Sequence, residues 1–164
     1  MMKEPEKLGS EYYRGFLTRQ GQAFYDRINA QLLRGDYSGK TTFPISNPEV
    51  SASDCFAAYK AIRDDHPEFF YLGFQSEFTR RGQTGTLEYP ILYAPEIIDR
   101  IRQQVRKSVC RTVRGTAHLQ MIDREILVYE RISKKLAYSN HSDVRDHNIV
   151  GPVLLSSGVC EGHN

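Results

Sequence analysis

HPEFFYLGFQSEFTRRGQTGTLEYPILY, residues 66–93, carries the clearest β-forming signal in the chain. The aromatic run 69–74 predicts a buried strand, which continues through residues 77–80 toward the turn-prone sequence RRGQTG. Residues 86–93 predict a returning strand, in which Pro90 lacks the N–H donor that an interior strand needs. We therefore predict a small antiparallel hairpin whose second strand lies at an edge or carries a bulge.

Helices are predicted before this hairpin. Residues 10–33 place apolar side chains mostly three or four positions apart, which indicates an amphipathic helix. Residues 40–48 are short and broken by prolines, so they predict a loop or an edge strand. Ser51 with Asp54 three positions later predicts a capping box that opens a second helix, and this helix is expected to end at His66.

Two more helical patterns follow the hairpin. Pro95 fits the first turn of a helix, whose core-facing stripe is predicted to comprise Ile98, Ile101, Val105 and Val109. The pattern kinks or breaks near Gly115, and a second apolar stripe runs through residues 119–136. Residues 139–158 predict a loop. Helices segregated around a small antiparallel sheet define the α+β class, with a helical and hairpin region at 1–114 and a second region at 115–164.

Composition limits the classes of protein to which the chain belongs. With 164 residues, 40% of them apolar and 26% charged, it is long and apolar enough for a folded core. The 22 basic and 20 acidic residues leave a net charge of +2, so the overall field is weak and nucleic acid is not an expected partner. The opening MMKEPEKLGSEYY has no continuous apolar run, so we expect no secretory signal, no membrane anchor and a cytoplasmic location.

Three widely spaced cysteines argue against a disulfide framework and for reduced thiols. Cys55 and Cys110 lie in or beside apolar helical stripes, so we predict that both fill core positions. Cys160 differs, because Ser156 and Gly158 before it allow a capped and sharply turned helix start. Unpaired amides and the dipole of such a helix favour a thiolate. Cys160 is therefore the candidate nucleophile, and its alternative role is a small apolar filler.

The last part of the chain resembles a known family. A helix at 122–136, the segment LAYS at 136–139, a polar loop, GPVL at 151–154 and GVCEG at 158–162 follow one another. This order is similar to that of the bacterial transglutaminase-like superfamily, in which a GVCxG-type motif carries the nucleophile, here Cys160. HPEFFYLGF also looks like an aromatic segment that precedes the core in some members. The resemblance implies that residues 115–164 begin a papain-like catalytic core.

The resemblance also implies a chemistry. Cys160 would carry out acyl transfer or amide hydrolysis through a thioester, on a protein or peptide substrate and without a cofactor. The general base of the family is a histidine on a strand well downstream, followed by an orienting acid, and no position of this sequence matches either. We therefore expect the chain to be the N-terminal part of such an enzyme and to be inactive by itself. Neither a membrane nor nucleic acid is an expected partner, and the sequence does not indicate an oligomeric state.

Two alternatives stay open. His163 lies three positions after Cys160, and His141 and His147 lie upstream, so a small Cys/His zinc domain is one of them. The gap between His141 and His147 is wider than that of most structural zinc ligand pairs, and the distant base of the family argues against all three histidines as that base. The second alternative is a non-catalytic interaction module, whose basic run at 100–114 either contacts acidic partners or forms a solvated helix face.

Overall fold

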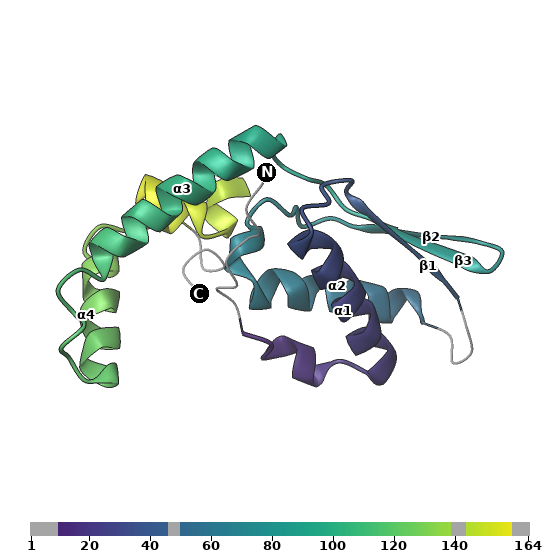
Figure 1. Cartoon of the computed structure of the whole chain (residues 1–164), viewed down its shortest axis with the longest axis horizontal. Helices are drawn as coiled ribbons and strands as arrows, with labels where there is room; N and C mark the ends of the chain where they lie inside the picture. The colour runs from purple at the N-terminus through teal and green to yellow at the C-terminus, as the bar shows by residue number, and fades with distance from the viewer. Residues whose placement is uncertain (1–9, 46–49, 139–143, 159–164) are drawn as a thin grey trace. The chain divides into compact units, whose positions relative to one another are not determined.

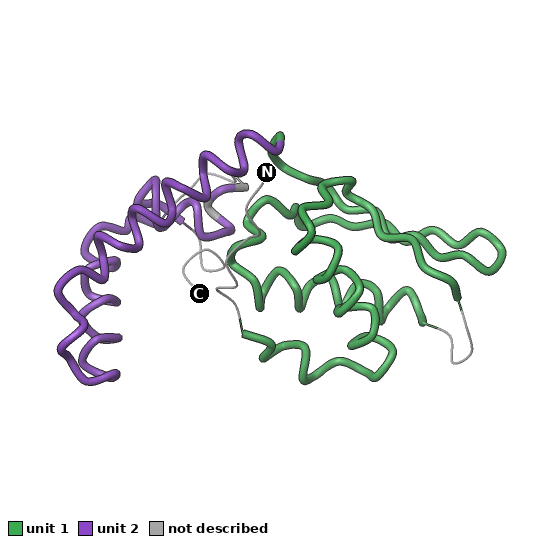
Figure 2. The backbone as a smooth tube through the Cα atoms, in the orientation of Figure 1, with its two compact units in different colours: residues 1–94 green, residues 95–164 purple. Residues whose placement is uncertain are grey.

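The computed structural model describes residues 10–45, 50–138 and 144–158, and its helices and small antiparallel sheet give the chain an α+β fold (Figure 1). Contacts divide the chain into two compact units, residues 1–94 and residues 95–164 (Figure 2). The boundary predicted between residues 114 and 115 concerns the start of a catalytic core and stays a prediction. Within the described ranges, no helix combines the length and apolar character that crossing a membrane requires.

The first helix of unit 1 is shorter than predicted. Helix α1 (Arg19–Leu33) begins after Thr18, whose hydroxyl accepts a 3.0 Å hydrogen bond from the Gly21 amide. Leu17 is extended, with ψ of 153°, so it separates α1 from a 3-10 turn, η1 (Tyr13–Phe16). The prediction of one continuous helix over residues 10–33 was wrong because this local N-cap starts the helix at residue 19.

The second helix of unit 1 has the predicted ends. Helix α2 (Ala52–Asp65) begins at a capping box, in which the Ser51 hydroxyl accepts from the Asp54 amide and the Asp54 carboxylate accepts from the Ser51 amide, each at 3.0 Å. His66 is its C-cap, and the following Pro67 starts a new turn. Both ends depend on adjacent residues, so the sequence predicted them correctly.

A three-stranded antiparallel sheet covers the helices of unit 1 on one side (Figure 1). Strands β2 (Glu77–Arg81) and β3 (Thr84–Glu88) form the predicted hairpin. The prediction that its second strand lies at an edge or carries a bulge was wrong, because β1 (Lys40–Pro44) pairs with the other side of β3 and makes it the central strand. Residues on β1 and β3 alternate between buried and more exposed, so one face of the sheet packs on the core. Phe43 lies opposite Gly85, and its ring fills the space that a Cβ at Gly85 would occupy, at 2.6 Å.

Residues 69–74 do not form the predicted strand. Pro67–Phe69 forms a 3-10 turn, η2, and only Leu72 makes an isolated β-bridge, with Ile91. The pairing stops there because Pro90, beside Gly73, has no N–H to extend the ladder. The aromatic run is nevertheless buried, so the prediction of burial was correct and the prediction of a strand was wrong. The core of unit 1 contains Phe24, Tyr25, Ile28, Leu32, Phe43, Cys55, Ala58, Tyr59, Ile62, Phe69, Phe70, Tyr71, Leu72, Leu87 and Tyr89.

Unit 2 begins with the long helix that Pro95 predicts. Helix α3 (Pro95–Thr112) buries Ile98 and Val105, whereas Val109 at its far end is 40% exposed. The predicted break near Gly115 is confirmed, because Gly115 has a φ of 77°, which favours glycine. Helix α4 (Met121–Ser133) follows. The remaining elements are β4 (Ala137–Tyr138), the 3-10 turn η3 (Val144–His147), the π-helical turn η4 (Gly151–Leu155) and β5 (Ser157–Gly158).

Helix α4 carries its apolar stripe on an exposed face. Ile122, Ile126 and Tyr129 are 61%, 52% and 73% exposed, and none of the residues of α4 is buried within the described part of the chain. The side of α4 that carries Arg131 instead faces the end of α3, where Arg131 Nη1 donates to the carbonyls of Thr112 and Arg114. The apolar stripe therefore contributes nothing to the core of the described chain.

Candidate functional site

The described chain approaches Cys160 through a short parallel pair of strands. β4 is separated by three residues from the end of α4 and pairs with β5, so that Ala137 lies opposite Ser157 and Tyr138 lies opposite Gly158. Gly158 is the first residue of GVCEG, two positions before Cys160. The fold therefore brings the end of α4 beside the start of this motif, although 19 residues separate Tyr138 from Gly158 in the sequence.

Backbone geometry just before the motif is closely constrained. Ser156 adopts a left-handed conformation with a φ of 56°, and its carbonyl accepts a 2.9 Å hydrogen bond from the Ala137 amide. One turn earlier, the Ser108 hydroxyl of α3 donates to the Val153 carbonyl at 3.0 Å. These two hydrogen bonds attach the segment before the motif to α3 and to β4. The sequence predicted a loop here and gave no indication of the parallel pairing.

The predicted nucleophile and two of the three nearby histidines lie outside the described residues. These are Cys160, His141 and His163. The helix start expected at Cys160 therefore stays a prediction. His147 is described and lies half-buried at the end of η3. In the ranges that the structure covers, no three His, Cys, Asp or Glu side chains gather as a metal site requires, and the zinc alternative depends on residues beyond those ranges.

Cys55 fills a core position, as predicted. Its side chain is fully buried on α2, and burial followed by the nearby Asp54 charge raises the pKa of the thiol to about 12. A thiol of this kind is almost entirely protonated at neutral pH, and the thiolate is the nucleophile. Cys55 is therefore a structural residue.

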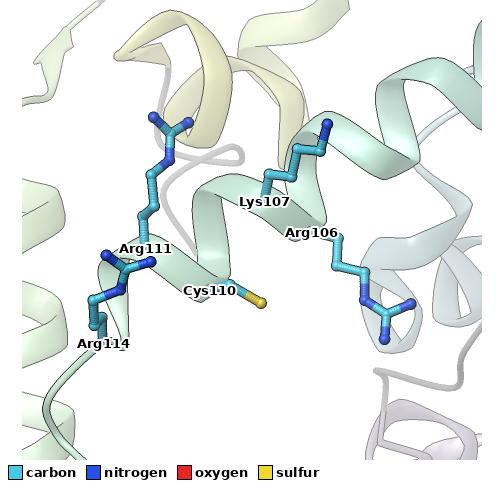
Figure 3. A pocket seen from close by; sticks show the side chains of 5 residues that line it. All are labelled: Arg106, Lys107, Cys110, Arg111 and Arg114. Atoms are coloured by element: carbon cyan, nitrogen blue, oxygen red, sulfur yellow. The ribbon is translucent and has the colours of Figure 1, made fainter.

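Cys110 does not fill the core, so that prediction was wrong. The thiol is exposed on α3, because position 110 lies on the side of the helix opposite the buried Ile98 and Val105. Four basic side chains, Arg106, Lys107, Arg111 and Arg114, surround it in a shallow hollow (Figure 3). The sequence placed Cys110 beside an apolar stripe, and the helical angle decides that it faces solvent instead.

The environments of these two thiols predict a large difference in reactivity. With a pKa of about 12, roughly one Cys55 side chain in ten thousand is ionised at pH 8. We expect iodoacetamide at pH 8 to modify Cys110 in the native protein and to leave Cys55 unmodified, as measured by peptide mass spectrometry. Unfolding in urea removes the burial, so both thiols should then react at similar rates. Modification of native Cys55 at the rate of Cys110 would contradict the burial of its side chain.

A buried polar cluster at the end of α2 was not predicted. The Tyr25 hydroxyl donates to Asp65 Oδ2 at 3.0 Å and lies 2.9 Å from His66 Nε2, while His66 Nδ1 lies 2.9 Å from Glu68 Oε1. All four side chains are at most 4% exposed. Burial and the hydrogen bond to Asp65 raise the pKa of the Tyr25 hydroxyl, which stays protonated as a donor. The sequence DDHPE at 64–68 was interpreted only as a helix end, although a histidine between two acids is a signal for such a cluster.

This cluster attaches η1 to the core. The Asp65 carboxylate also accepts hydrogen bonds from the amides of Tyr13 and Arg14, at 2.9 and 3.1 Å. Because its side chains are buried and paired within the fold, substrate has no access to them. We therefore interpret the cluster as structural.

The sequence matches no family model, and no curated protein is significantly similar to it. The fold and the described site thus define the class of the protein as α+β.

Proposed function

We propose that Cys160 is the nucleophile of a transglutaminase-like cysteine enzyme, and that this chain carries the part of the enzyme that leads to and contains that nucleophile. The observation that carries the proposal is the order of elements before GVCEG. An amphipathic helix, an aromatic segment ending at Tyr138, a polar loop and an apolar turn precede the motif in that order.

The described chain supports this proposal in one specific way. Three residues separate the end of α4 from β4, and the pairing of Tyr138 with Gly158 joins this strand to the first residue of the motif. A nucleophile needs a fixed backbone around it, since a side chain on an unsupported chain end is not held in a reactive geometry. The parallel strand pair and the hydrogen bond from Ala137 to Ser156 supply such support two to four positions before Cys160.

The proposed reaction is acyl transfer through a thioester. The Cys160 thiolate attacks the carbonyl carbon of a glutamine side-chain amide or a peptide bond, a C–S bond forms, and the C–N bond breaks. The leaving amine takes up a proton from a general acid. A second amine then displaces the thiolate and forms a new amide, or water displaces it and forms a carboxylic acid. A histidine base and an orienting acid complete this mechanism, and no residue of the printed sequence matches the family positions for them.

Selective labelling of Cys160 tests the proposal. If the first turn of a helix stabilises its thiolate, iodoacetamide should modify Cys160 faster than Cys110 at pH 6.5, where most ordinary thiols are protonated. Rates are measured by peptide mass spectrometry, and the Cys160→Ser variant identifies the signal. Cys110 is the internal control for accessibility, because it is exposed and lies among four basic side chains.

Equal or slower modification of Cys160 would remove the support for an activated nucleophile.

A second measurement tests whether a histidine of this chain acts as the general base. We expect the 164-residue chain to incorporate no fluorescent amine into a glutamine-containing protein, because no histidine matches the family base. Turnover that the Cys160→Ser variant abolishes would keep the nucleophile and show that one of the histidines of this chain acts as its base.

A further inference from the structure

The last three turns of α3 carry a dense positive surface. We define the basic face as Arg106, Lys107, Arg111 and Arg114, the four basic side chains around Cys110. Figure 3 shows Arg111 and Arg114 extending to one side of the thiol and Arg106 to the other. All four are on the exposed side of α3 or at its end, away from the buried Ile98 and Val105. The basic face is therefore available to a partner from solvent.

The sequence around these residues contains no negative charge. Between Arg100 and Ile122 the sequence contains six arginines and lysines and no aspartate or glutamate. Lys107, Arg111 and Arg114 make no side-chain hydrogen bond or ion pair in the described part of the chain. Lys107 and Arg111 are four positions apart, a spacing at which like charges destabilise a helix. An anion that spans several of these side chains would relieve that repulsion.

Favourable interaction with the helix dipole does not explain the whole surface. Basic residues near a helix C-terminus do stabilise the helix, but the effect is confined to the last turn. Arg111 is the basic residue in that turn, and Arg131 already donates to the carbonyls of Thr112 and Arg114 at 2.6 and 2.9 Å. Lys107 lies further back along α3, where its charge has no helix-capping role. This charge is unpaired within the described part of the chain and points to an external anion.

The size of the basic face favours a short anionic segment. Residues 106–114 span about 12 Å along the helix axis, which about four residues of extended polypeptide match. Of 22 basic residues, six lie at 100–122, so the rest of the chain has 16 basic against 20 acidic residues. A chain whose remainder is net negative is a poor partner for a long polyanion or a charged membrane, whereas a short acidic segment needs the basic face alone.

We propose that the basic face docks an acidic polypeptide segment, a run of about four aspartate or glutamate residues on a partner or substrate protein. Arginine side chains bind carboxylates through two parallel hydrogen bonds, and three of the four cations are arginines. The proposal is independent of the chemistry at Cys160. It holds whether or not that thiol is a nucleophile.

Binding of a labelled octaglutamate peptide, followed by fluorescence anisotropy, tests the proposal with the full chain. We expect saturable binding at 50 mM NaCl, none of an octaglutamine peptide, and weakening at 300 mM NaCl because salt screens exposed charges. The double variant Arg111→Gln/Arg114→Gln should weaken binding by roughly fivefold. The matched control Lys134→Gln/Lys135→Gln removes the same charge from exposed residues elsewhere in unit 2 and should change binding less than twofold.

Cys110 provides a second readout that locates the peptide. Saturating octaglutamate should slow the modification of Cys110 by the neutral reagent N-ethylmaleimide at least threefold, because the thiol lies inside the basic face. Three results would overturn the proposal: no saturable binding, equal loss of affinity in the two double variants, or binding without protection of Cys110. Tighter binding of a single-stranded oligonucleotide of equal charge, or of vesicles containing anionic phospholipid, would likewise reject an acidic polypeptide as the ligand.

Discussion

The Asp65→Ala substitution is expected to lower the free energy of unfolding by about 3 kcal/mol. The Asp65 carboxylate is 2% exposed and accepts hydrogen bonds from the Tyr25 hydroxyl and from the amides of Tyr13 and Arg14. Alanine removes the carboxylate that accepts from all three donors. The Tyr25 hydroxyl keeps its contact with His66 Nε2 but lies in the core, where water cannot replace the lost carboxylate. The substitution should also detach η1, since its first two amides are held by this carboxylate.

Urea unfolding followed by tyrosine fluorescence measures this effect. The chain has no tryptophan, and eight of its ten tyrosines lie at residues 1–94, so the signal reports on unit 1. Asp64→Ala is the matched control, because Asp64 is adjacent, its side chain is 29% exposed and it pairs with Lys60 on the surface. We expect a change below about 0.5 kcal/mol for the control. Equal effects at the two positions would show that the buried cluster does not stabilise unit 1.

Substituting Gly39 by alanine is expected to destabilise unit 1 by a similar amount, about 3 kcal/mol. Gly39 has a φ of 69°, and a Cβ there would lie 2.7 Å from the Tyr89 carbonyl oxygen. The neighbouring backbone cannot move freely, because the Tyr89 amide donates to the Gly39 carbonyl at 2.8 Å and the Tyr89 ring stacks on Tyr59 in the core. Both the backbone conformation and the close contact therefore oppose a side chain.

Gly82→Ala separates these two causes. Gly82 has a comparable φ of 58°, but nothing lies within 4 Å of a Cβ placed there. Its substitution should cost only the backbone strain, about 1 kcal/mol. Urea unfolding of the two variants gives the comparison, and circular dichroism confirms that both keep their helices. If Gly82→Ala is as destabilising as Gly39→Ala, the contact with Tyr89 contributes nothing and strain alone explains both.

The comparison of Cys55 with Cys110 shows the limit of periodic patterns. Both cysteines lie near apolar residues of a helix, and the sequence predicted a core position for each. Only Cys55 is buried, because α2 packs against α1, whereas the side of α3 that carries Cys110 meets solvent. Which face of a helix is covered depends on the other elements of the fold. The periodic pattern alone therefore does not show whether a residue beside the apolar stripe is buried.

Local chemistry determined several features from the sequence alone. The capping box of Ser51 and Asp54, the helix start at Pro95, the break near Gly115, the hairpin at 77–88 and thus the α+β class all depend on residues close together in the chain. Tertiary structure alone decided that the buried residues 69–72 form no strand, and it decided the Tyr25 and Asp65 cluster and the pairing of Tyr138 with Gly158. Tyr138 and Gly158 are 20 positions apart and Tyr25 and Asp65 are 40 positions apart, and residues 69–72 lack a partner strand. No short-range pattern encodes which distant backbone or side chain will be adjacent after folding.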